Sequence, residues 1–376
     1  MEQENIENDP DFGISGENPF PSDSDIGSDC CSAKASVGLR TMTLPVLAIT
    51  FGDATGIGPE LVAKMLTRPE VLAAARVVLV GDAWVWKGAQ RIAGTALSVV
   101  TIRDWREARD PGQTLMLLEL DTVSQGDIAP AQATAAAGRG ALKALTVCLD
   151  AAKRGDIDAI CFAPLNKLAM KKGGMEFEDE LQFFADFFGA KDYFCEFNTL
   201  GTLWTSRISS HIALADIPRY ITKDRIEAAV RLTYQTLERA GFAKPRVAVA
   251  ALNPHGGEGG TCGREEIDVI EPAIKALNAE GLPVLGPFPA DAIFLKARDG
   301  ALDGIVTMYH DQGQIAVKLM GFERGVTVQG GLPIPITTPA RGTAFEIAGQ
   351  GKANAEGMTQ AFLLAAKMAA TQAVSR

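Results

Sequence analysis

The sequence predicts an α/β protein in which helices cover both faces of a mostly parallel β-sheet. From Pro45 onward, short apolar segments alternate with longer segments that have the periodicity of helices. The apolar segments are continuous and lack the apolar–polar alternation of a strand with one face in water. Strands of this kind are buried on both faces, which is typical of parallel sheets between two layers of helices.

The expected strands are mostly apolar runs of four or five residues. In chain order they are Val46–Thr50, Arg76–Val80, Leu115–Leu118, Ala159–Phe162, Phe194–Phe197, Val247–Ala251 and Ile305–Met308. The expected helices cover residues 57–67, 129–153, 222–241, 264–279 and 356–372. Pro59 lies in the first turn of the first helix, where its fixed backbone angle and missing N–H are tolerated.

The composition is that of a globular protein. The chain has 376 residues, 47% of them hydrophobic and 22% charged, which suits two domains or one large α/β unit. No segment approaches the roughly 18 uncharged apolar residues that a membrane-spanning helix needs, so we expect no membrane association.

The net charge of −10 is concentrated at the N-terminus. Residues 1–33 contain nine acidic residues and neither Lys nor Arg, so the rest of the chain is nearly neutral. Without a basic stripe, nucleic-acid binding is not expected. Residues 1–42 should form a disordered acidic tail, because they cannot bury enough apolar surface to offset the entropy of ordering. This tail is regulatory, an inert extension, or the product of a misplaced start codon.

The six cysteines form no CxxC pair and show no regular spacing. Cys148 and Cys161 lie inside apolar runs, as small buried residues commonly do. The N-terminus lacks the basic and apolar regions of a secretory signal. These features predict a protein of the reducing cytoplasm.

The chain has three histidines, each in a polar segment beside an expected strand. His211 follows two serines, His255 lies in Asn253–Glu258 (NPHGGE), and His310 lies in Met308–Gly313 (MYHDQG). Ligands and catalytic groups gather at strand ends in open α/β sheets. Three neutral imidazoles could bind a divalent metal and leave positions open for a substrate. The alternative is three unrelated loop or capping histidines.

Two glycine-rich segments are candidates for binding a ligand. Gly52–Glu60 (GDATGIGPE) follows the first strand, and Arg341–Asn354 (RGTAFEIAGQGKAN) lies near the C-terminus. Glycines let the backbone approach a ligand closely, and a helix N-terminus could receive an anion. Neither segment is a Rossmann or P-loop fingerprint. A plain strand-to-helix turn and a long surface loop are the alternatives.

Lys318 lies eight residues after His310, roughly 80° around a helix axis from it. It could therefore face the same site, although a lone lysine on a helix is commonly a surface residue.

Several of these segments together resemble the 4-hydroxythreonine-4-phosphate dehydrogenase family, which belongs to the broader isocitrate and isopropylmalate dehydrogenase fold. They are Gly52–Glu60, Ala163–Lys167 (APLNK), Asn253–Glu266 (NPHGGEGGTCGREE), Met308–Gly313 and Arg341–Asn354. The similarity runs from about Val46 to Met368. It implies one dehydrogenase domain over residues 43–376, with two α/β subdomains, a mostly parallel sheet and a cleft between the subdomains.

The resemblance also implies a site. The family binds a divalent metal (Zn, Mn, Co, Ni or Mg) through three histidines that match His211, His255 and His310. It is a homodimer whose site lies at the subunit interface, and it uses NAD or NADP. The positions that match its cofactor loop are Gly342, Thr343, Ala344, Gly349 and Asn354.

The substrate pocket departs from the family pattern. A Gly-His-Thr-Glu motif of the family aligns with Asp179–Gln182, which places Glu180 and Leu181 at its substrate-binding His and Thr. Thr327 and Ile336 replace a substrate-binding Asn and Arg, whereas Lys318 is retained. Because cationic donors supply most of the binding of a phosphate, we expect a changed substrate. Arg341 replaces a further histidine, which leaves the preference for NAD or NADP open.

These residues predict a metal-dependent dehydrogenase that oxidises a secondary alcohol, and decarboxylation is expected as a second step. The expected substrate is a small non-phosphorylated hydroxy acid, such as the cis-dihydrodiol carboxylates of terephthalate breakdown. Lys318 would bind a substrate oxygen or relay a proton, and Asp311 would orient a ligand imidazole. The alternatives are 4-hydroxythreonine-4-phosphate dehydrogenase itself, in pyridoxal phosphate biosynthesis, and a non-catalytic protein that binds metal or nucleotide.

Overall fold

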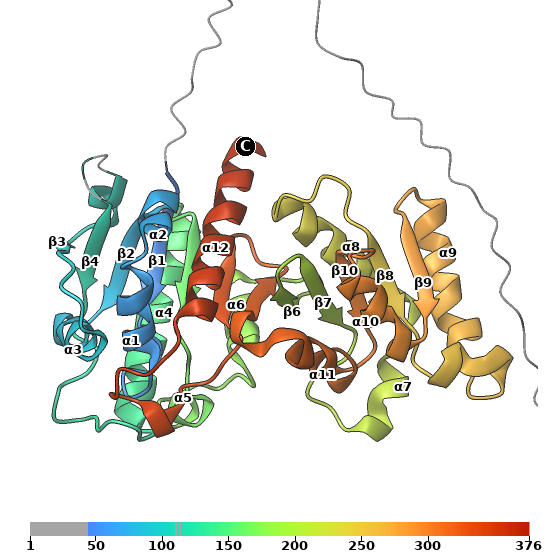
Figure 1. The fold of residues 1–376 in the computed structure, drawn as a ribbon, viewed down its shortest axis with the longest axis horizontal. Helices are drawn as coiled ribbons and strands as arrows, with labels where there is room; N and C mark the ends of the chain where they lie inside the picture. The colour runs from blue at the N-terminus through green and yellow to red at the C-terminus, as the bar shows by residue number, and fades with distance from the viewer. Residues whose placement is uncertain (1–43, 110–111, 113, 376) are drawn as a thin grey trace, which may run out of the picture. The chain divides into compact units, whose positions relative to one another are not determined.

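The computed structural model describes residues 44–109, 112 and 114–375 (Figure 1). The acidic tail expected over residues 1–42 lies outside the described residues. The described chain is an α/β structure around a 12-stranded sheet with the strand order β3-β4-β2-β1-β5-β12-β11-β6-β7-β10-β8-β9. The predicted fold class is confirmed.

All seven expected strands are present. The strands are β1 Val46–Thr50, β2 Arg76–Gly81, β3 Val100–Ile102, β4 Leu115–Glu119, β5 Ala159–Phe162, β6 Cys195–Leu200, β7 Leu203–Arg207, β8 Val247–Ala250, β9 Val284–Phe288, β10 Gly304–Thr307, β11 Val326–Gly330 and β12 Ile336–Pro339. The sequence did not predict β3, β7, β9, β11 or β12. Strands β7, β11 and β12 carry Thr, Arg or Gln among their apolar residues, so they lack the continuous apolar pattern.

The α-helices are α1 Gly58–Met65, α2 Pro69–Ala74, α3 Ala83–Ala93, α4 Ala135–Arg154, α5 Lys167–Lys172, α6 Glu180–Phe188, α7 Ile217–Tyr220, α8 Lys223–Arg239, α9 Glu271–Ala279, α10 Ala290–Arg298, α11 His310–Gly321 and α12 Glu356–Ser375. Short 3₁₀ turns are η1 Trp105–Arg109, η2 Leu214–Asp216, η3 Pro254–Gly260, η5 Phe322–Arg324 and η6 Phe345–Ile347, and η4 Glu266–Ile270 is a π-helical turn. The helix expected from residue 129 begins only at Ala135. Thr134 caps it by accepting a hydrogen bond from the Ala137 N–H, and Ala131 has a positive φ of 59°.

The directions of the strands divide the sheet into two parallel blocks. Strands β3, β4, β2, β1, β5 and β12 run parallel to one another, and so do β7, β10, β8 and β9. Between the blocks, β11 pairs antiparallel with β12 and β6, and β6 pairs antiparallel with β7. The sheet is therefore mostly parallel and made of two α/β parts, with antiparallel strands where the parts meet.

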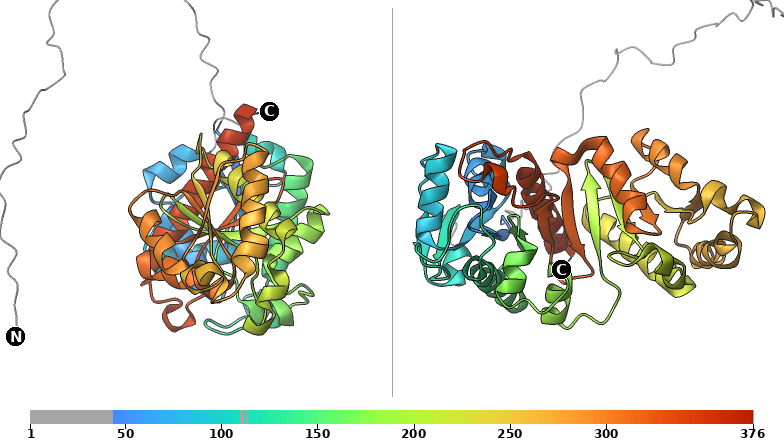
Figure 2. Two further views of the ribbon diagram at one scale, coloured as in Figure 1. Left: turned by 90° about the vertical axis from the view of Figure 1, so that its right-hand side faces the viewer. Right: turned by 90° about the horizontal axis from the view of Figure 1, so that it is seen from below.

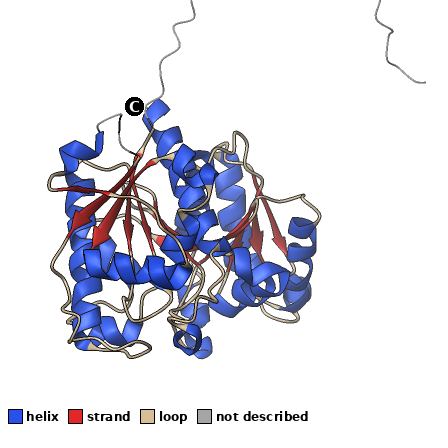
Figure 3. Cartoon of the chain, turned by 60° about the vertical axis from the view of Figure 1, so that its left-hand side comes forward, coloured by secondary structure: helices blue, strands red, loops and turns tan. Residues whose placement is uncertain are grey.

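Both faces of the sheet are covered, as the continuous apolar strands predicted. Within β1, Leu47 and Ile49 join the core on one face, and Val46 and Ala48 join the core on the other. Helices α1, α3, α8, α9 and α12 supply the first core, and α4 and α6 supply the second. A third core lies under α10 and α11. The helices flank the strands on both sides (Figure 2) (Figure 3).

No helix in the described part of the chain combines the length and the apolar character needed to span a membrane.

An ion pair connects the residues immediately before β8 and β10, Arg246 and Asp303. These two strands precede the His255 and His310 segments. Asp303 accepts hydrogen bonds from the backbone N–H, Nε and Nη2 of Arg246, at 2.9, 3.0 and 2.7 Å. The Arg246 hydrogen bonds hold the pKa of Asp303 below its usual value. Ionised Asp303 therefore stabilises the fold above pH ~4, the usual Asp pKa, and this contribution is lost as the pH falls through the lowered native pKa.

We expect Asp303→Asn to lower the midpoint of thermal unfolding by a few degrees at neutral pH, and by less as the medium is made acidic. Thermal scans followed by circular dichroism measure this. Asp299→Asn is the matched control, because Asp299 pairs with Arg298 on the surface, where both side chains are more than half exposed. A difference that does not change with pH would show that Asp303 acts only through its shape.

Candidate active site

A cavity of about 180 Å³ lies beside α11, where the two parts of the sheet meet. Its lining residues come from β6, β7, β11 and α11, from the start of α5, and from the segments that follow β7 and β12 and precede β11. They are Lys167, Glu196, Asn198, Thr199, Arg207, His211, His310, Gln314, Val317, Lys318, Gly321, Gly325, Thr327 and Ala340. Helix α11 packs on β6 and β7, so residues on one side of this helix face the cavity.

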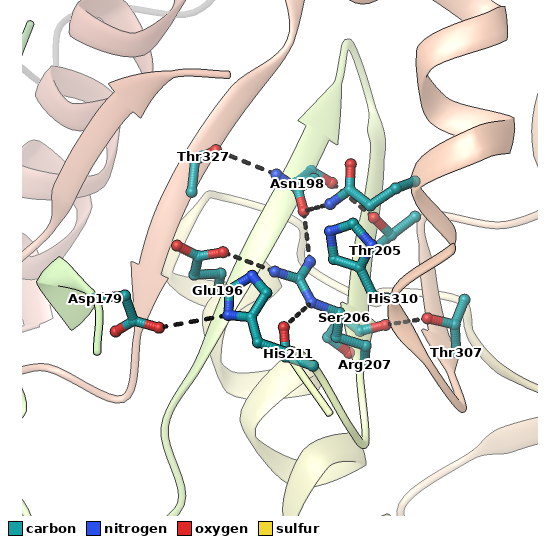
Figure 4. A network of polar contacts seen from close by, with 12 residues as sticks. Asp179, Glu196, Asn198, Thr205, Ser206, Arg207, His211, Thr307, His310 and Thr327 are labelled. Atoms are coloured by element: carbon teal, nitrogen blue, oxygen red, sulfur yellow. Dashed lines mark hydrogen bonds and ion pairs between the residues drawn. The ribbon is translucent and has the colours of Figure 1, made fainter. Parts of the chain in front are cut away.

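Two of the three histidines meet at this cavity. The ring centroids of His211 and His310 are 5.8 Å apart, with the ring planes inclined by 43° (Figure 4). A carboxylate lies beside each ring. The Nδ1 atom of His310 is 2.7 Å from Oδ1 of Asp311, and that of His211 is 3.9 Å from Oδ2 of Asp179. Asp311 lies within hydrogen-bond distance and can fix the orientation of the His310 imidazole, whereas Asp179 is farther from the ring of His211.

The third histidine does not line the cavity. His255 lies in η3, after β8, where residues 255–259 all have positive φ angles. Among the residues that the structure describes, no group of three His, Cys, Asp or Glu side chains could hold a metal ion. The single chain therefore brings His211 and His310 together and leaves His255 apart.

The η3 segment has a strained backbone, and a buried carboxylate binds the backbone just before it. His255 and Glu258 have φ angles of 55° and 45°, which non-glycine residues rarely adopt. The buried Glu266 accepts hydrogen bonds from the backbone N–H groups of Leu252 and Asn253, at 2.7 and 2.8 Å. Strain of this kind persists only where surrounding contacts enforce it, and it is common at ligand-binding sites.

A buried arginine forms part of the cavity wall. Arg207 is 7% exposed and donates from Nη2 to Glu196 Oε2 at 2.6 Å, from Nη1 to Asn198 Oδ1 at 2.7 Å, and from Nε to Ser210 Oγ at 3.0 Å. Asn198 donates in turn to Thr327 Oγ1 at 3.1 Å (Figure 4). The cavity lining thus contains three cationic side chains, on Lys167, Arg207 and Lys318, and a single carboxylate among the described residues.

The predicted substrate-binding residues divide into two groups. Lys318 and Thr327 line the cavity. Leu181 and Ile336 do not, because they are 5% and 0% exposed and pack in the core beneath the sheet. The side chains of both residues are buried in the core.

Glu180 is also outside the lining of the cavity. It begins α6, and burial raises the pKa of its carboxyl, with the carboxylates of Glu196 and Asp179 adding to the rise. The expectation that Glu180 repels a phosphorylated substrate therefore has no support in the geometry of this cavity.

The two glycine-rich segments pack against each other. The Ile57 N–H donates to the Thr343 carbonyl at 3.0 Å, and Lys64 Nζ donates to the carbonyls of Gly351 and Ala353, both at 2.8 Å. The buried Glu60 accepts a hydrogen bond from the Ala353 N–H at 2.8 Å. The sequence predicted each segment separately, and the fold joins them into one unit.

The predicted cofactor-binding residues lie in this unit. A Cβ atom added at Gly342 or Gly349 would meet nothing within 4 Å, so the backbone at both positions is open to a ligand. Thr343 is buried against Gly56, and Ala344 has a positive φ of 42°. Asn354 instead caps α12, because its Oδ1 accepts a hydrogen bond from the Glu356 N–H at 2.9 Å.

The sequence did not single out Glu196, Asn198, Arg207 or Gln314. All four are polar residues within a strand or helix, and a polar residue there is usually on the surface. The position of Arg207, four residues before His211, was a signal that could have identified it.

The fold and this cavity define an α/β enzyme with a cationic pocket beside paired imidazoles. The sequence matches the family model of the pyridoxal phosphate biosynthetic protein PdxA over residues 73–365. It is 48% identical over 333 residues to a Pseudomonas aeruginosa protein provisionally named 4-hydroxythreonine-4-phosphate dehydrogenase 2, covering 88% of this chain and 98% of that one. The D-threonate 4-phosphate dehydrogenase of Cupriavidus necator is 38% identical, over 88% of this chain and 99% of that one.

Solved structures of dehydrogenases have a similar fold. A 4-hydroxythreonine-4-phosphate dehydrogenase from Burkholderia phymatum matches with a TM-score of 0.74 and 36% identity, over 86% of this chain and 98% of that one. A terephthalate 1,2-cis-dihydrodiol dehydrogenase from Burkholderia xenovorans matches with a TM-score of 0.59 and 28% identity, over 84% and 98%. The chain is thus an NAD(P)-dependent dehydrogenase that acts on a CH–OH group. It belongs to the PdxA family.

The comparisons correct the expected substrate. They favour the phosphorylated substrates in the names of the PdxA relatives over a non-phosphorylated dihydrodiol acid. The sequence argument relied on Glu180, Leu181 and Ile336, none of which lines the cavity.

Proposed function

We propose that this protein oxidises the secondary alcohol of a phosphorylated hydroxy acid, such as 4-hydroxythreonine 4-phosphate or D-threonate 4-phosphate. The observation that carries the proposal is the charge of the cavity. Lys167, Arg207 and Lys318 exceed the one carboxylate, Glu196, by two charges, beside two imidazoles. Cationic donors of this kind are the preferred partners of phosphate and carboxylate groups.

The paired imidazoles suit a divalent metal. Two imidazoles on one ion at ~2.1 Å place their ring centroids roughly 5 to 6 Å apart, and those of His211 and His310 are 5.8 Å apart. We propose that His255 of the partner subunit supplies the third ligand, since the same chain keeps it away from this pair. The metal would act as a Lewis acid toward the substrate hydroxyl, and Zn, Mn, Co, Ni and Mg remain the candidates.

The other groups of the site would position the reactants. Asp311 holds the ring of His310. Lys318 would donate a hydrogen bond to a substrate oxygen or relay the proton that leaves the hydroxyl as hydride passes to the nicotinamide. The open backbone at Gly342 and Gly349 would accommodate NAD or NADP, whose nicotinamide accepts the hydride. Oxidation at carbon 3 of these acids would leave a ketone β to the carboxylate, a compound that readily loses CO₂.

A second copy of the chain would cover apolar side chains next to the cavity. On α11, Ile315, Leu319 and Met320 are 58%, 84% and 37% exposed, and Leu168 on α5 is 58% exposed. Both helices also supply cavity residues. Exposed apolar residues beside a functional cavity are typical of a subunit interface, which supports a homodimer with the site at the interface. Three buried free thiols, Cys148, Cys161 and Cys195, support a reducing compartment such as the cytoplasm.

Steady-state formation of NADH or NADPH tests the proposed function. Enzyme stripped of metal and reloaded with Zn²⁺, Mn²⁺ or Mg²⁺ is offered 4-hydroxythreonine 4-phosphate, D-threonate 4-phosphate and the cis-dihydrodiol of terephthalate. We expect a phosphorylated substrate to give the highest kcat/KM, by at least about tenfold, because charge-assisted donors face it. A higher kcat/KM for the dihydrodiol would overturn the proposal.

A further inference from the structure

Arg207 occupies an unusual place for a guanidinium. It ends β7 with its side chain 7% exposed, in the wall of the cavity and four residues from His211. Of the other residues of β7, Leu203 and Trp204 are buried in apolar cores, at 4% and 1% exposure, and the buried polar residues Thr205 and Ser206 carry no charge. A buried charge is costly to desolvate, and an apolar residue of similar volume often stabilises a fold as well or better. A role in stability alone therefore does not explain an arginine at this position.

The contacts of Arg207 fix its orientation and leave part of it available. Its bonds to Glu196, Asn198 and Ser210 use one N–H on each of its three nitrogens. A guanidinium has five N–H groups, so one on each terminal nitrogen has no partner among the described residues. The planar fork suits two-point binding of an oxyanion, which a lysine cannot reproduce.

The hydrogen-bond network around Arg207 connects β6, β11 and α11. Asn198 on β6 accepts from Arg207 and from Gln314 Nε2 on α11, and it donates to Thr327 on β11. Glu196 lies at 17% exposure on the same strand as Asn198. A connected network of this kind holds its central group more firmly than a single contact would. The guanidinium is thus preorganised, which favours selective binding.

We propose that Arg207 is a specificity-determining residue that receives the carboxylate of the substrate. The Arg207 Nε–H bonds Ser210, the residue next to His211, so the guanidinium lies close to the centre where the alcohol would be held. In the acids named above, the carboxylate is two carbons from the alcohol that would be oxidised. Lys167 and Lys318 line the same cavity and are placed to receive a second anionic group. This inference rests on the proposed function and names the residue that recognises one part of its substrate.

Four ligands test the inference by calorimetric titration in the absence of NAD. They are D-threonate 4-phosphate, D-threonate, and the two matching compounds with CH₂OH in place of the carboxylate, threitol 4-phosphate and threitol. We expect the wild type to bind each carboxylate at least about tenfold more tightly than its CH₂OH counterpart. In Arg207→Met this ratio should fall to about one, while the affinity for threitol 4-phosphate stays within about twofold.

Two further variants make the result specific. Arg207→Lys keeps the positive charge and loses the planar fork, so it should give a ratio between those of the wild type and Arg207→Met. This more conservative variant keeps the test valid if Arg207→Met fails to fold. Arg231→Met removes another Arg–Glu pair, with Glu280 on the surface, and should keep the wild-type ratio.

The outcomes separate the inference from the proposed function. An unchanged ratio in Arg207→Met, or equal losses for threonate 4-phosphate and threitol 4-phosphate, would overturn the inference and leave the function standing. A ratio that depends on Arg207 with no gain from the phosphate would support the inference and overturn the phosphorylated substrate. No binding of any of the four ligands would overturn both.

Discussion

Two inactive variants of this protein, His255→Ala and His310→Ala, are expected to recover activity when their chains are mixed and allowed to exchange subunits. Each variant alone should lose nearly all metal-dependent turnover, because each would lack one imidazole of every proposed metal site. In a mixed dimer, the His255→Ala chain supplies intact His211 and His310, and the His310→Ala chain supplies intact His255. One of the two sites is then complete, so a random equal mixture should reach about a quarter of wild-type activity.

The geometry of the single chain motivates this expectation. His211 and His310 lie with their ring centroids 5.8 Å apart, whereas His255 lies apart from them on η3. A mixture of His211→Ala and His310→Ala is the matched control. Both substitutions remove ligands that the same chain would supply, so no pairing of the two variants produces a complete site. Activity and bound Zn²⁺ per chain are measured together. Absence of recovery in a mixture shown to contain mixed dimers would overturn the shared site.

Gly138→Ala is expected to destabilise the fold by about 3 kcal/mol and to reduce activity. A Cβ atom at Gly138 on α4 would lie 1.8 Å from the Ala169 carbonyl oxygen and 2.9 Å from the Met170 nitrogen. Both atoms belong to the backbone of α5, so no side-chain rotation can relieve the clash. Helix α5 begins at Lys167, a cavity residue, and its displacement should move that cation. Urea unfolding followed by tryptophan fluorescence measures the loss of stability.

Gly88→Ala is the matched control for this substitution. Gly88 lies within α3, and a Cβ atom there would meet nothing within 4 Å. The same chemical change should therefore stabilise the protein by roughly 0.5 to 1 kcal/mol, because alanine is the better helix former. Equal effects of the two substitutions would show that close packing of α4 against α5 is unimportant.

Sequence patterns located the elements that are buried on both faces. Strands such as β1 and β5 are continuous apolar runs, and helix α8 has clear helical periodicity, so both kinds of element could be predicted. Strands β11 and β12 could not, because buried Thr side chains such as Thr327 and Thr337 are hydrogen-bonded to neighbours distant in sequence. One such neighbour is Ala361 of α12, whose carbonyl accepts the hydrogen bond of Thr337 in β12.

Motif positions predicted the family and the chemical groups, but not which side chains meet. Leu181 and Ile336 were expected to contact the substrate from their motif positions, but both side chains are buried in the core of this chain. Arg207 has no place in those motifs, yet it lies in the wall of the cavity.

The sequence by itself determined the α/β class, the family and the three histidines, because each follows from residue type and local order. Only the tertiary structure decided that two of those imidazoles face each other and the third lies apart. It also decided that the cavity holds an excess of cations. The physical reason is that β6, β7, β11 and α11 are brought together by pairing and packing between distant parts of the chain, and no local pattern specifies which of their side chains share one space.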